Sequence, residues 1–217
     1  MTKFFFIRHG KTEWNLEGRY QGAKGDSPLL PQSYEEIKQV GQYLKKYHFD
    51  QIFCSPIKRA RTTAKEIAKE IGYKGQVIPI ENFREFNLGK MEGMKFTDVE
   101  KKYPAELNGF RYHPDLYHPE NIGAESFEDV FKRFPPKVKE IARKYPDGNI
   151  MIVSHGAVLC AAIRHLLGVP LADIRARGGL ANTSTTILET RDAEHFKCLA
   201  WNKTSYLRRK LDKSDIV

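Results

Sequence analysis

Two histidines in this chain stand at the ends of short, mostly apolar runs, and a glycine follows each of them. His9 comes after Phe4–Ile7 and Arg8, and His155 comes after the run 149–154. Runs of this length are typical of strands that are buried on both faces of a sheet. The ligand crevice of an open α/β sheet lies beyond the carboxyl ends of its strands. The sequence therefore predicts a paired-histidine site at that edge, where Arg8 adds a charge suited to an anionic substrate.

The first histidine segment also has a simpler explanation, because a buried strand followed by an ordinary polar loop would have the same pattern. Polar side chains recur at short intervals after it and Gly22 closes the segment; these side chains belong to Thr12, Asn15, Arg19 and Gln21. The second histidine, which also ends a buried run, favours the paired-histidine interpretation over the simpler one.

Five motifs along the chain form a highly specific combination. R-H-G-x-T-x-W-N and R-x-Q-G lie in the first 22 residues, D-S-P-L follows them, S-P-x-x-R-A-x-x-T-A spans Ser55–Ala64, and S-H-G spans Ser154–Gly156. With these motifs, the chain from Lys3 to Trp201 resembles the histidine phosphatase superfamily, whose members include the cofactor-dependent phosphoglycerate mutases. A further run, R-E-F-N-L-G-K-M-E-G at Arg84–Gly93, most resembles the broad-specificity phosphatases of that superfamily.

The resemblance implies which residues carry the chemistry. His9 would be the nucleophile that forms phosphohistidine, and Glu85 would protonate the leaving oxygen and then activate water. Arg8, Arg59 and a protonated His155 would stabilise the phosphoryl charge. The residues that would face the phosphate or the substrate are Asn15, Gln21, Gly22 and Gly156. The implied activity is metal-independent hydrolysis of small phosphate monoesters, with no cofactor, and we expect the aromatic residues of a cap to bury Glu85.

Other functions are compatible with part of this pattern. A phosphoglycerate mutase would use the same residues and return the phosphoryl group to the substrate, and a phosphatase dedicated to one metabolite would share the site. A basic RNA-binding or regulatory domain with a vestigial site is a third alternative, but all five expected catalytic residues are present. Lys11 stands where many relatives carry glutamate, and we expect it to change the charge at the mouth of the site.

The elements that must position these residues alternate between strands and helices. Further strands are expected at 51–54 and 76–80, helices at 96–103 and 157–167, and a hairpin at 183–189 and 195–201. This alternation predicts an α/β fold, a three-layer α/β/α sandwich with a mostly parallel central sheet. We expect one domain over residues 1–217, with a small irregular cap at about 83–126.

Local signals predict where several of these elements begin and end. Ser55 is expected to cap a helix that has Pro56 as its first residue and Arg59 in its first turn. Ser33-x-x-Glu36 suggests a capping box near Pro31. The stretch 105–125 is expected to be irregular, because it contains Pro114, Pro119 and Gly123. Pro135-Pro136 should break or kink the amphipathic stretch 126–145.

The composition is that of a globular protein, with 217 residues, 41% hydrophobic residues and a formal net charge of +9. No apolar run approaches the ~20 residues of a membrane span, and the N-terminus lacks the features of a signal peptide, so we expect a cytoplasmic protein. Cys54, Cys160 and Cys198 are expected to be reduced and buried. The expected partner is a small phosphorylated metabolite rather than nucleic acid or membrane. A homo-oligomer is compatible with the sequence. The basic stretch 203–213 is expected to be a solvated tail.

Overall fold

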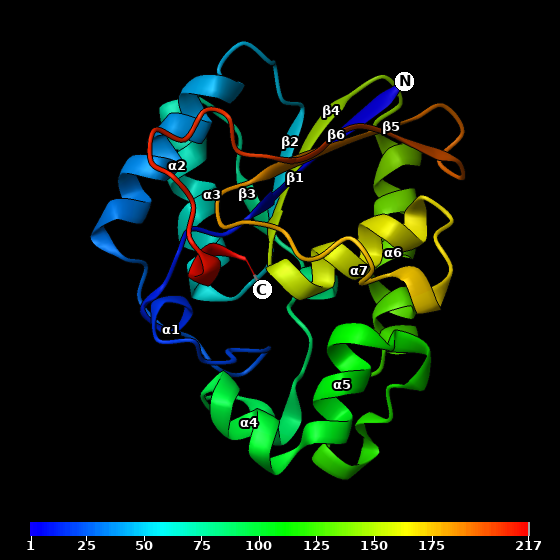
Figure 1. Ribbon diagram of the computed structural model, residues 1–217. Helices are drawn as coiled ribbons and strands as arrows, with labels where there is room; N and C mark the ends of the chain where they lie inside the picture. The colour runs from blue at the N-terminus through cyan, green and yellow to red at the C-terminus, as the bar shows by residue number, and fades with distance from the viewer. Residues whose placement is uncertain (217) are drawn as a thin grey trace.

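The first apolar run forms β1 (Thr2–Arg8), a strand in the middle of a six-stranded sheet with the order β3-β2-β4-β1-β5-β6. The computed structural model describes residues 1–216 of the chain (Figure 1). The other strands are β2 (Gln51–Cys54), β3 (Val77–Pro79), β4 (Asn149–Ser154), β5 (Thr185–Thr190) and β6 (Phe196–Lys203).

Most of the sheet is parallel, as predicted. β1 pairs with β4 in parallel register, with Arg8 opposite Ser154, and β4 continues in parallel to β2 and then to β3. β5 runs antiparallel to β1 and forms the expected hairpin with β6. Because parallel strands end at the same edge of a sheet, Arg8 and His9 after β1 lie beside His155 after β4.

Two helical layers cover the sheet, which confirms the three-layer α/β/α architecture (Figure 1). Phe5 and Ile7 pack under the first layer, and Phe4 and Phe6 pack under the second. The first layer consists of α2 (Pro31–Leu44) and α3 (Lys58–Glu70), and the second of α6 (Phe127–Lys144) and α7 (Gly156–Leu166). Each fully buried phenylalanine stabilises the fold by roughly 1.5–3 kcal/mol, so β1 is held firmly from both sides.

The segment beyond the carboxyl edge of the sheet is more regular than predicted. After the short α1 (Glu13–Leu16), two further helices lie below that edge, α4 (Phe96–Lys102) and α5 (Pro104–Tyr112) (Figure 1). The expectation of irregular structure over 105–125 is therefore wrong for its first part, since Pro104 begins a helix there. The helix-breaking residues Pro114, Pro119 and Gly123 interrupt regular structure only after Tyr112, where short 3₁₀ turns follow.

Both predicted serine caps are wrong, because each serine has a distant partner. α2 begins at Pro31 with Leu30 as its N-cap, and the Ser33 hydroxyl donates to the Lys11 carbonyl at 2.6 Å. α3 begins only at Lys58, and the Ser55 hydroxyl lies 2.7 Å from the His155 ring. Arg59 is nevertheless in the first turn of α3, as expected.

The proline pair does not break its helix. Pro135 and Pro136 lie inside α6, which continues from Phe127 to Lys144. Proline removes two backbone N–H donors from the helix at this point. The buried side chains before and after the pair, including Phe134 and Val138, keep the helix packed on the sheet, so tertiary packing outweighs the local cost.

The remaining expectations concern the cysteines and the membrane. All three cysteines are free thiols, and Cys54 and Cys160 are buried, whereas Cys198 is only partly buried. Among residues 1–216, no helix combines the length and apolar character that crossing a bilayer requires.

Candidate active site

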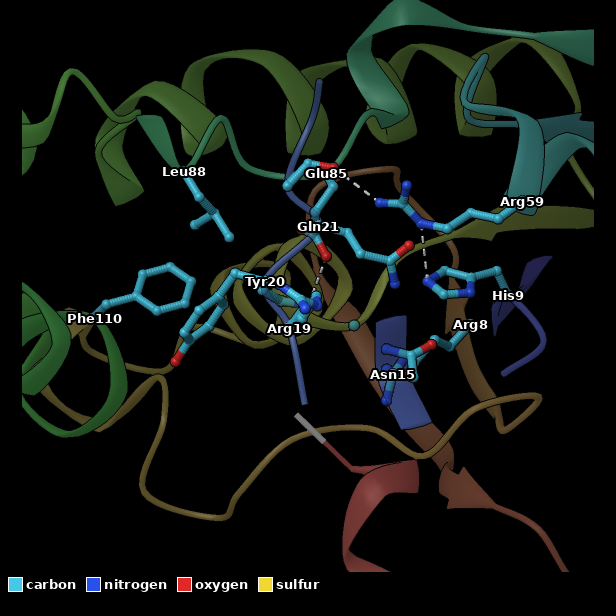
Figure 2. Close-up of a pocket in the computed structure, with 13 residues that line it drawn as sticks. Arg8, His9, Asn15, Arg19, Tyr20, Gln21, Arg59, Glu85, Leu88 and Phe110 are labelled. Atoms are coloured by element: carbon cyan, nitrogen blue, oxygen red, sulfur yellow. Dashed lines mark hydrogen bonds between the residues drawn. The ribbon is translucent and has the colours of Figure 1, made fainter. Parts of the chain in front are cut away.

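One pocket at the carboxyl edge of the sheet collects the predicted site residues (Figure 2). Every predicted site residue except His155 lines it, and the ring of His155 lies directly behind, with its centroid 5.2 Å from that of His9. β1 delivers Arg8 and His9, the first turn of α3 delivers Arg59, and the loop after β3 delivers Glu85. The pocket thus brings together side chains that are distant from one another in the sequence.

The orientation of the His9 ring is fixed by its own loop. His9 is 3% exposed, and its Nδ1 lies 2.7 Å from the carbonyl oxygen of Gly10. A carbonyl oxygen only accepts, so Nδ1 carries the proton and Nε2 carries the lone pair. The Nε of Arg59 donates to this Nε2 at 3.3 Å. The lone pair of His9 Nε2 therefore points towards, and accepts a hydrogen bond from, the guanidinium that would hold the phosphoryl group.

The second histidine is held differently. Nε2 of His155 lies 2.7 Å from the Ser55 hydroxyl, which accepts the N–H of Ile57 at 3.2 Å. Nδ1 of His155 is buried and has no hydrogen-bond partner within residues 1–216. When the Ser55 hydroxyl donates to Nε2, Nδ1 carries the proton and is left as an unused donor.

The surroundings of both histidines favour the neutral form at neutral pH. Burial lowers the pKa of His9 well below its usual value, and the positive charges of Arg59 and Arg8 lower it further. The pKa of His155 is lowered in the same way by burial, then by Arg59, His9 and Arg8. The positive donor that a protonated His155 would provide therefore requires a bound dianion that raises its pKa.

These pKa directions predict an NMR titration with an internal control. The ring signals of His9 and His155 should not titrate between pH 6 and 8, because their pKa values lie well below 6.5. His195 is exposed and its pKa is raised by the Asp192 carboxylate, so its ring should titrate with a midpoint above 6.5. Long-range ¹⁵N spectra with assignments from histidine variants would measure all three. A His9 midpoint at or above that of His195 would contradict this account.

Two buried arginines supply the positive charge. Arg59 is 2% exposed and donates to the carbonyl oxygens of Gly22 at 2.9 Å and Gly25 at 2.7 Å, and it pairs with Asp26 at 3.1 Å. Arg8 is also 2% exposed, and burial lowers its pKa to about 10, which leaves it charged at neutral pH. Fixed guanidinium groups of this kind match the geometry of phosphoryl oxygens.

Glu85 lies at the N-terminus of α7. One carboxylate oxygen accepts the N–H of Ala157 at 3.1 Å, and the other accepts those of Val158 at 2.8 Å and Phe86 at 2.9 Å. The side chain is buried, as expected, and its carboxylate contacts two amides at the start of α7 and the amide of Phe86 in its own loop. A helix N-terminus favours a negative charge, and the three amides fix the direction of the carboxylate.

The polar residues after His9 serve the loop as well as the pocket. The amide oxygen of Asn15 accepts from Thr12, which closes the capping box at the start of α1. The amide of Gln21 donates to the Thr12 hydroxyl at 2.8 Å and accepts from Ser27 at 3.0 Å. Both side chains line the pocket, so their internal hydrogen bonds hold them there in one orientation.

Glu92, Glu125 and Arg133, which the sequence did not indicate as site residues, hold the loops next to the pocket through hydrogen bonds and an ion pair. The carboxylate of Glu92 accepts four backbone N–H groups, three from residues 23–25 and one from Leu88, at 2.9–3.1 Å. Arg133 donates to the carbonyl oxygens of Asn82, Arg84 and Glu85 and pairs with Glu125. Glu92 stands in the R-E-F-N-L-G-K-M-E-G run, whereas no local signal marks Arg133 on its long helix.

Apolar side chains from outside the sheet complete the pocket. Tyr20, Leu88 and Phe110 line it beside the charged groups, and Phe110 comes from α5 (Figure 2). Space is tight at Gly156, because a Cβ there would lie 3.0 Å from Nε of Arg8 and would press on the guanidinium. At Gly22, which has φ +63°, a Cβ would lie 2.3 Å from the Glu92 carboxylate.

Lys11 does not lie at the mouth of the site, and this expectation is wrong. Its side chain is 1% exposed and its amine pairs with Asp212 and Asp215, both at 3.2 Å. The basic stretch near the C-terminus is likewise not simply solvated, since Arg209 pairs with Glu36 and Asp215. Sequence position alone did not indicate that the two ends of the chain meet here.

Comparison with known proteins agrees with this architecture. The chain is 33% identical to phosphoserine phosphatase 1 of Hydrogenobacter thermophilus, over 79% of each chain. It is 35% identical to a 2,3-bisphosphoglycerate-dependent phosphoglycerate mutase of Cytophaga hutchinsonii, over 80% of this chain and 81% of the relative. The solved structure of Bacillus stearothermophilus YhfR superposes with a TM-score of 0.87 at 29% identity, covering 95% of this chain and 99% of that one.

The family assignment rests on most of the chain and on a fold that matches throughout. The pattern of the histidine phosphatase superfamily (branch 1) matches residues 4–204, which include both histidine strands, α3 and the loop of Glu85. The resemblance seen in the motifs is thereby confirmed, and the chain belongs to the histidine phosphatase superfamily.

Proposed function

We propose that this protein hydrolyses small phosphate monoesters through a phosphohistidine on His9, with no metal ion. The observation that carries the proposal is one buried pocket in which the lone pair of His9 Nε2, two guanidinium groups and the Glu85 carboxylate converge. The guanidinium groups of Arg8 and Arg59 supply the positive charge that metal ions supply in other phosphoryl-transfer enzymes.

The first step transfers the phosphoryl group to the protein. Nε2 of His9 attacks phosphorus, the bond between phosphorus and the ester oxygen breaks, and Glu85 in its protonated form gives its proton to the leaving alcohol. The Nδ1–H bond to Gly10 keeps the ring in the tautomer that the attack needs. As the dianion binds, His155 takes up a proton at Nε2, which then donates to the Ser55 hydroxyl, and its Nδ1–H, which has no partner within the described chain, serves as a donor to the phosphoryl group.

The second step regenerates the enzyme. The Glu85 carboxylate removes a proton from water, the oxygen attacks phosphorus, and the phosphorus–nitrogen bond to His9 breaks to release inorganic phosphate. The net reaction converts one ester and one water into an alcohol and phosphate, with Glu85 protonated again. The three amides that hold the Glu85 oxygens keep it at one place through both steps.

A mutase is the second candidate, and the relative named as a phosphoglycerate mutase favours it. A mutase must keep water from phosphohistidine while its intermediate reorients, which calls for an extended cover. Here a short segment, residues 86–154, separates Glu85 from His155, and beyond the sheet edge it contributes two short helices and several 3₁₀ turns. The relative named as a phosphoserine phosphatase and this short cover support hydrolysis instead.

The proposal predicts hydrolysis of several unrelated phosphate monoesters at rates that a chelator does not change. The same preparation, given 3-phosphoglycerate and a bisphosphoglycerate primer, should release inorganic phosphate faster than it forms 2-phosphoglycerate. Both products are followed in one time course, with and without EDTA. Interconversion much faster than phosphate release would favour the mutase. Loss of activity with EDTA and its return with a divalent ion would rule out the metal-independent mechanism.

A further inference from the structure

Asp215, near the C-terminus, contacts Arg8 through its backbone carbonyl. We call residues 209–216 the C-terminal segment. Nη1 of Arg8 donates to the carbonyl oxygen of Asp215 at 2.7 Å and to that of Leu180 at 2.5 Å. The same Asp215 carbonyl accepts the backbone N–H of Asn182 at 2.9 Å. One edge of the Arg8 guanidinium is therefore held by two backbone carbonyls, one of which belongs to the C-terminal segment.

The side chain of Asp215 fixes where that carbonyl lies. Asp215 is fully buried, and its carboxylate receives Arg209 at 2.8 Å, the Asp212 N–H at 2.7 Å and the amine of Lys11 at 3.2 Å. Burial alone would raise the pKa of Asp215, but the hydrogen bonds from Arg209, Asp212 and Lys11 lower it. Asp215 is thus a charged anchor that depends on its cationic partners.

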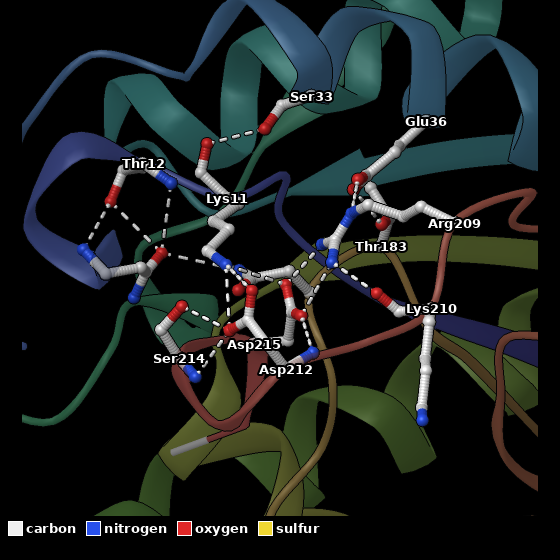
Figure 3. Close-up of polar contacts among 12 residues, drawn as sticks. Lys11, Thr12, Ser33, Glu36, Thr183, Arg209, Lys210, Asp212, Ser214 and Asp215 are labelled. Carbon is white, nitrogen blue, oxygen red and sulfur yellow. Dashed lines mark hydrogen bonds and ion pairs between the residues drawn. The ribbon is translucent and has the colours of Figure 1, made fainter.

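Lys11 connects this anchor to the active-site loop (Figure 3). It lies three positions after Arg8, and its amine contacts both oxygens of Asp212 at 3.2 Å in addition to Asp215. The pKa of Asp212 is lowered to about 2, first by Ser214 and then by Lys11. A buried ammonium group requires such partners, so Lys11 ties the C-terminal segment to the loop that follows β1.

We propose that Lys11 is a positioning residue for Arg8, and that it acts through the carbonyl oxygen of Asp215. A guanidinium is planar, so two carbonyls on Nη1 set the plane of the whole group. Nε of Arg8 has no partner among the described residues, and no hydrogen bond engages Nη2 there, which leaves these nitrogens for phosphoryl oxygens. This inference rests on the proposed function, in which Arg8 binds the phosphoryl group.

The alternative is that Lys11 only fastens the end of the chain. That role would affect the stability of the protein, whereas a positioning role also affects how well Arg8 binds a phosphoryl group. A displacement of about 1 Å at a reacting centre can cost about 100-fold in rate. The affinity for inorganic phosphate, which needs Arg8 but neither the leaving group nor Glu85 as an acid, separates the two roles.

The test compares Lys11→Met with wild type. Lys11→Met should lower kcat/KM about 10- to 100-fold and raise the inhibition constant of inorganic phosphate by a similar factor. The ratio of rates for good and poor leaving groups should stay unchanged, because Glu85 is not disturbed. Lys137→Met is the control, since Lys137 pairs with Glu140 on the exposed side of α6, and it should match wild type. Asp215→Asn keeps the carbonyl and removes the carboxylate charge, and should reproduce the effect if Lys11→Met does not fold.

A double-mutant cycle with Arg8→Lys gives the decisive result. If Lys11 acts through Arg8, Lys11→Met should change kcat/KM less than about threefold once Arg8 is replaced, because coupled residues are not additive. A full loss in the Arg8→Lys background would overturn the proposal, and so would an unchanged inhibition constant for phosphate in a folded Lys11→Met protein. Failure of wild type to hydrolyse any ester would instead contradict the proposed function.

Discussion

Replacement of His9 by alanine is expected to lower kcat/KM for every phosphate monoester by about 10⁴-fold or more, because the variant lacks the residue proposed to accept the phosphoryl group. The ring of His155 is near, with its centroid 5.2 Å away, but its Nε2 is engaged by Ser55. The remaining arginines should still bind phosphate, so the inhibition constant of inorganic phosphate should change far less than the rate.

The covalent intermediate gives a direct measurement of the same prediction. Wild-type protein quenched during turnover of a ³²P-labelled substrate should carry a label that is stable in base and lost in acid. His9→Ala should carry none, whereas His195→Ala, which removes an exposed histidine far from the pocket, should be labelled like wild type. A label retained in His9→Ala, or located on serine or cysteine, would show that His9 is not the nucleophile.

The second large effect is expected from Glu85→Gln. Hydrolysis of alkyl phosphates, whose leaving oxygen needs a proton, should slow by about 10²- to 10⁴-fold. Hydrolysis of nitrophenyl phosphate should slow much less in its first step, because nitrophenolate leaves without a proton. The amide of glutamine also has only one oxygen for three backbone N–H groups, so a small part of the loss will be common to all substrates.

The measurement for Glu85→Gln is a plot of log kcat/KM against the pKa of the leaving alcohol. Its slope should be steeper for the variant than for wild type. Glu81→Gln is the matched control, since Glu81 lies four residues earlier on the surface and its one ion pair within residues 1–216 is with Arg84. Parallel lines for Glu85→Gln and wild type would mean that Glu85 positions the substrate and does not transfer the proton.

The sheet was predictable because its signals are local. β2 and β4 have the predicted bounds, since buried strands appear as short apolar runs between turns. The helix starts failed where a side chain had a partner far along the chain. Ser33 contacts the Lys11 carbonyl and Ser55 contacts His155, so both hydroxyls that suggest caps are used in tertiary contacts. Inside α6, packing of the buried face overrode the proline pair.

The site was predictable to a different extent for each residue. Arg8, His9 and His155 follow from their positions after buried strands, whereas Glu85 lies in a loop and was indicated only by resemblance. The contacts of Glu92 and Arg133 join segments that are distant in sequence. The same is true of Lys11, whose partners lie about 200 residues away, at the other end of the chain. Spacing and periodicity describe neighbours along the chain, so they do not reveal such contacts.

The residues that line the pocket come from two different parts of the fold. Arg8 and Arg59, the groups proposed to bind the phosphoryl charge, are carried by β1 and by α3, which packs on the sheet, whereas Phe110 comes from α5 beyond the sheet edge. Under the proposed function, a substitution at Phe110 would change the shape that the pocket offers to the alcohol and leave Arg8 and Arg59 where they are. We therefore expect substrate preference to change through α5 without loss of the groups that bind the phosphoryl charge.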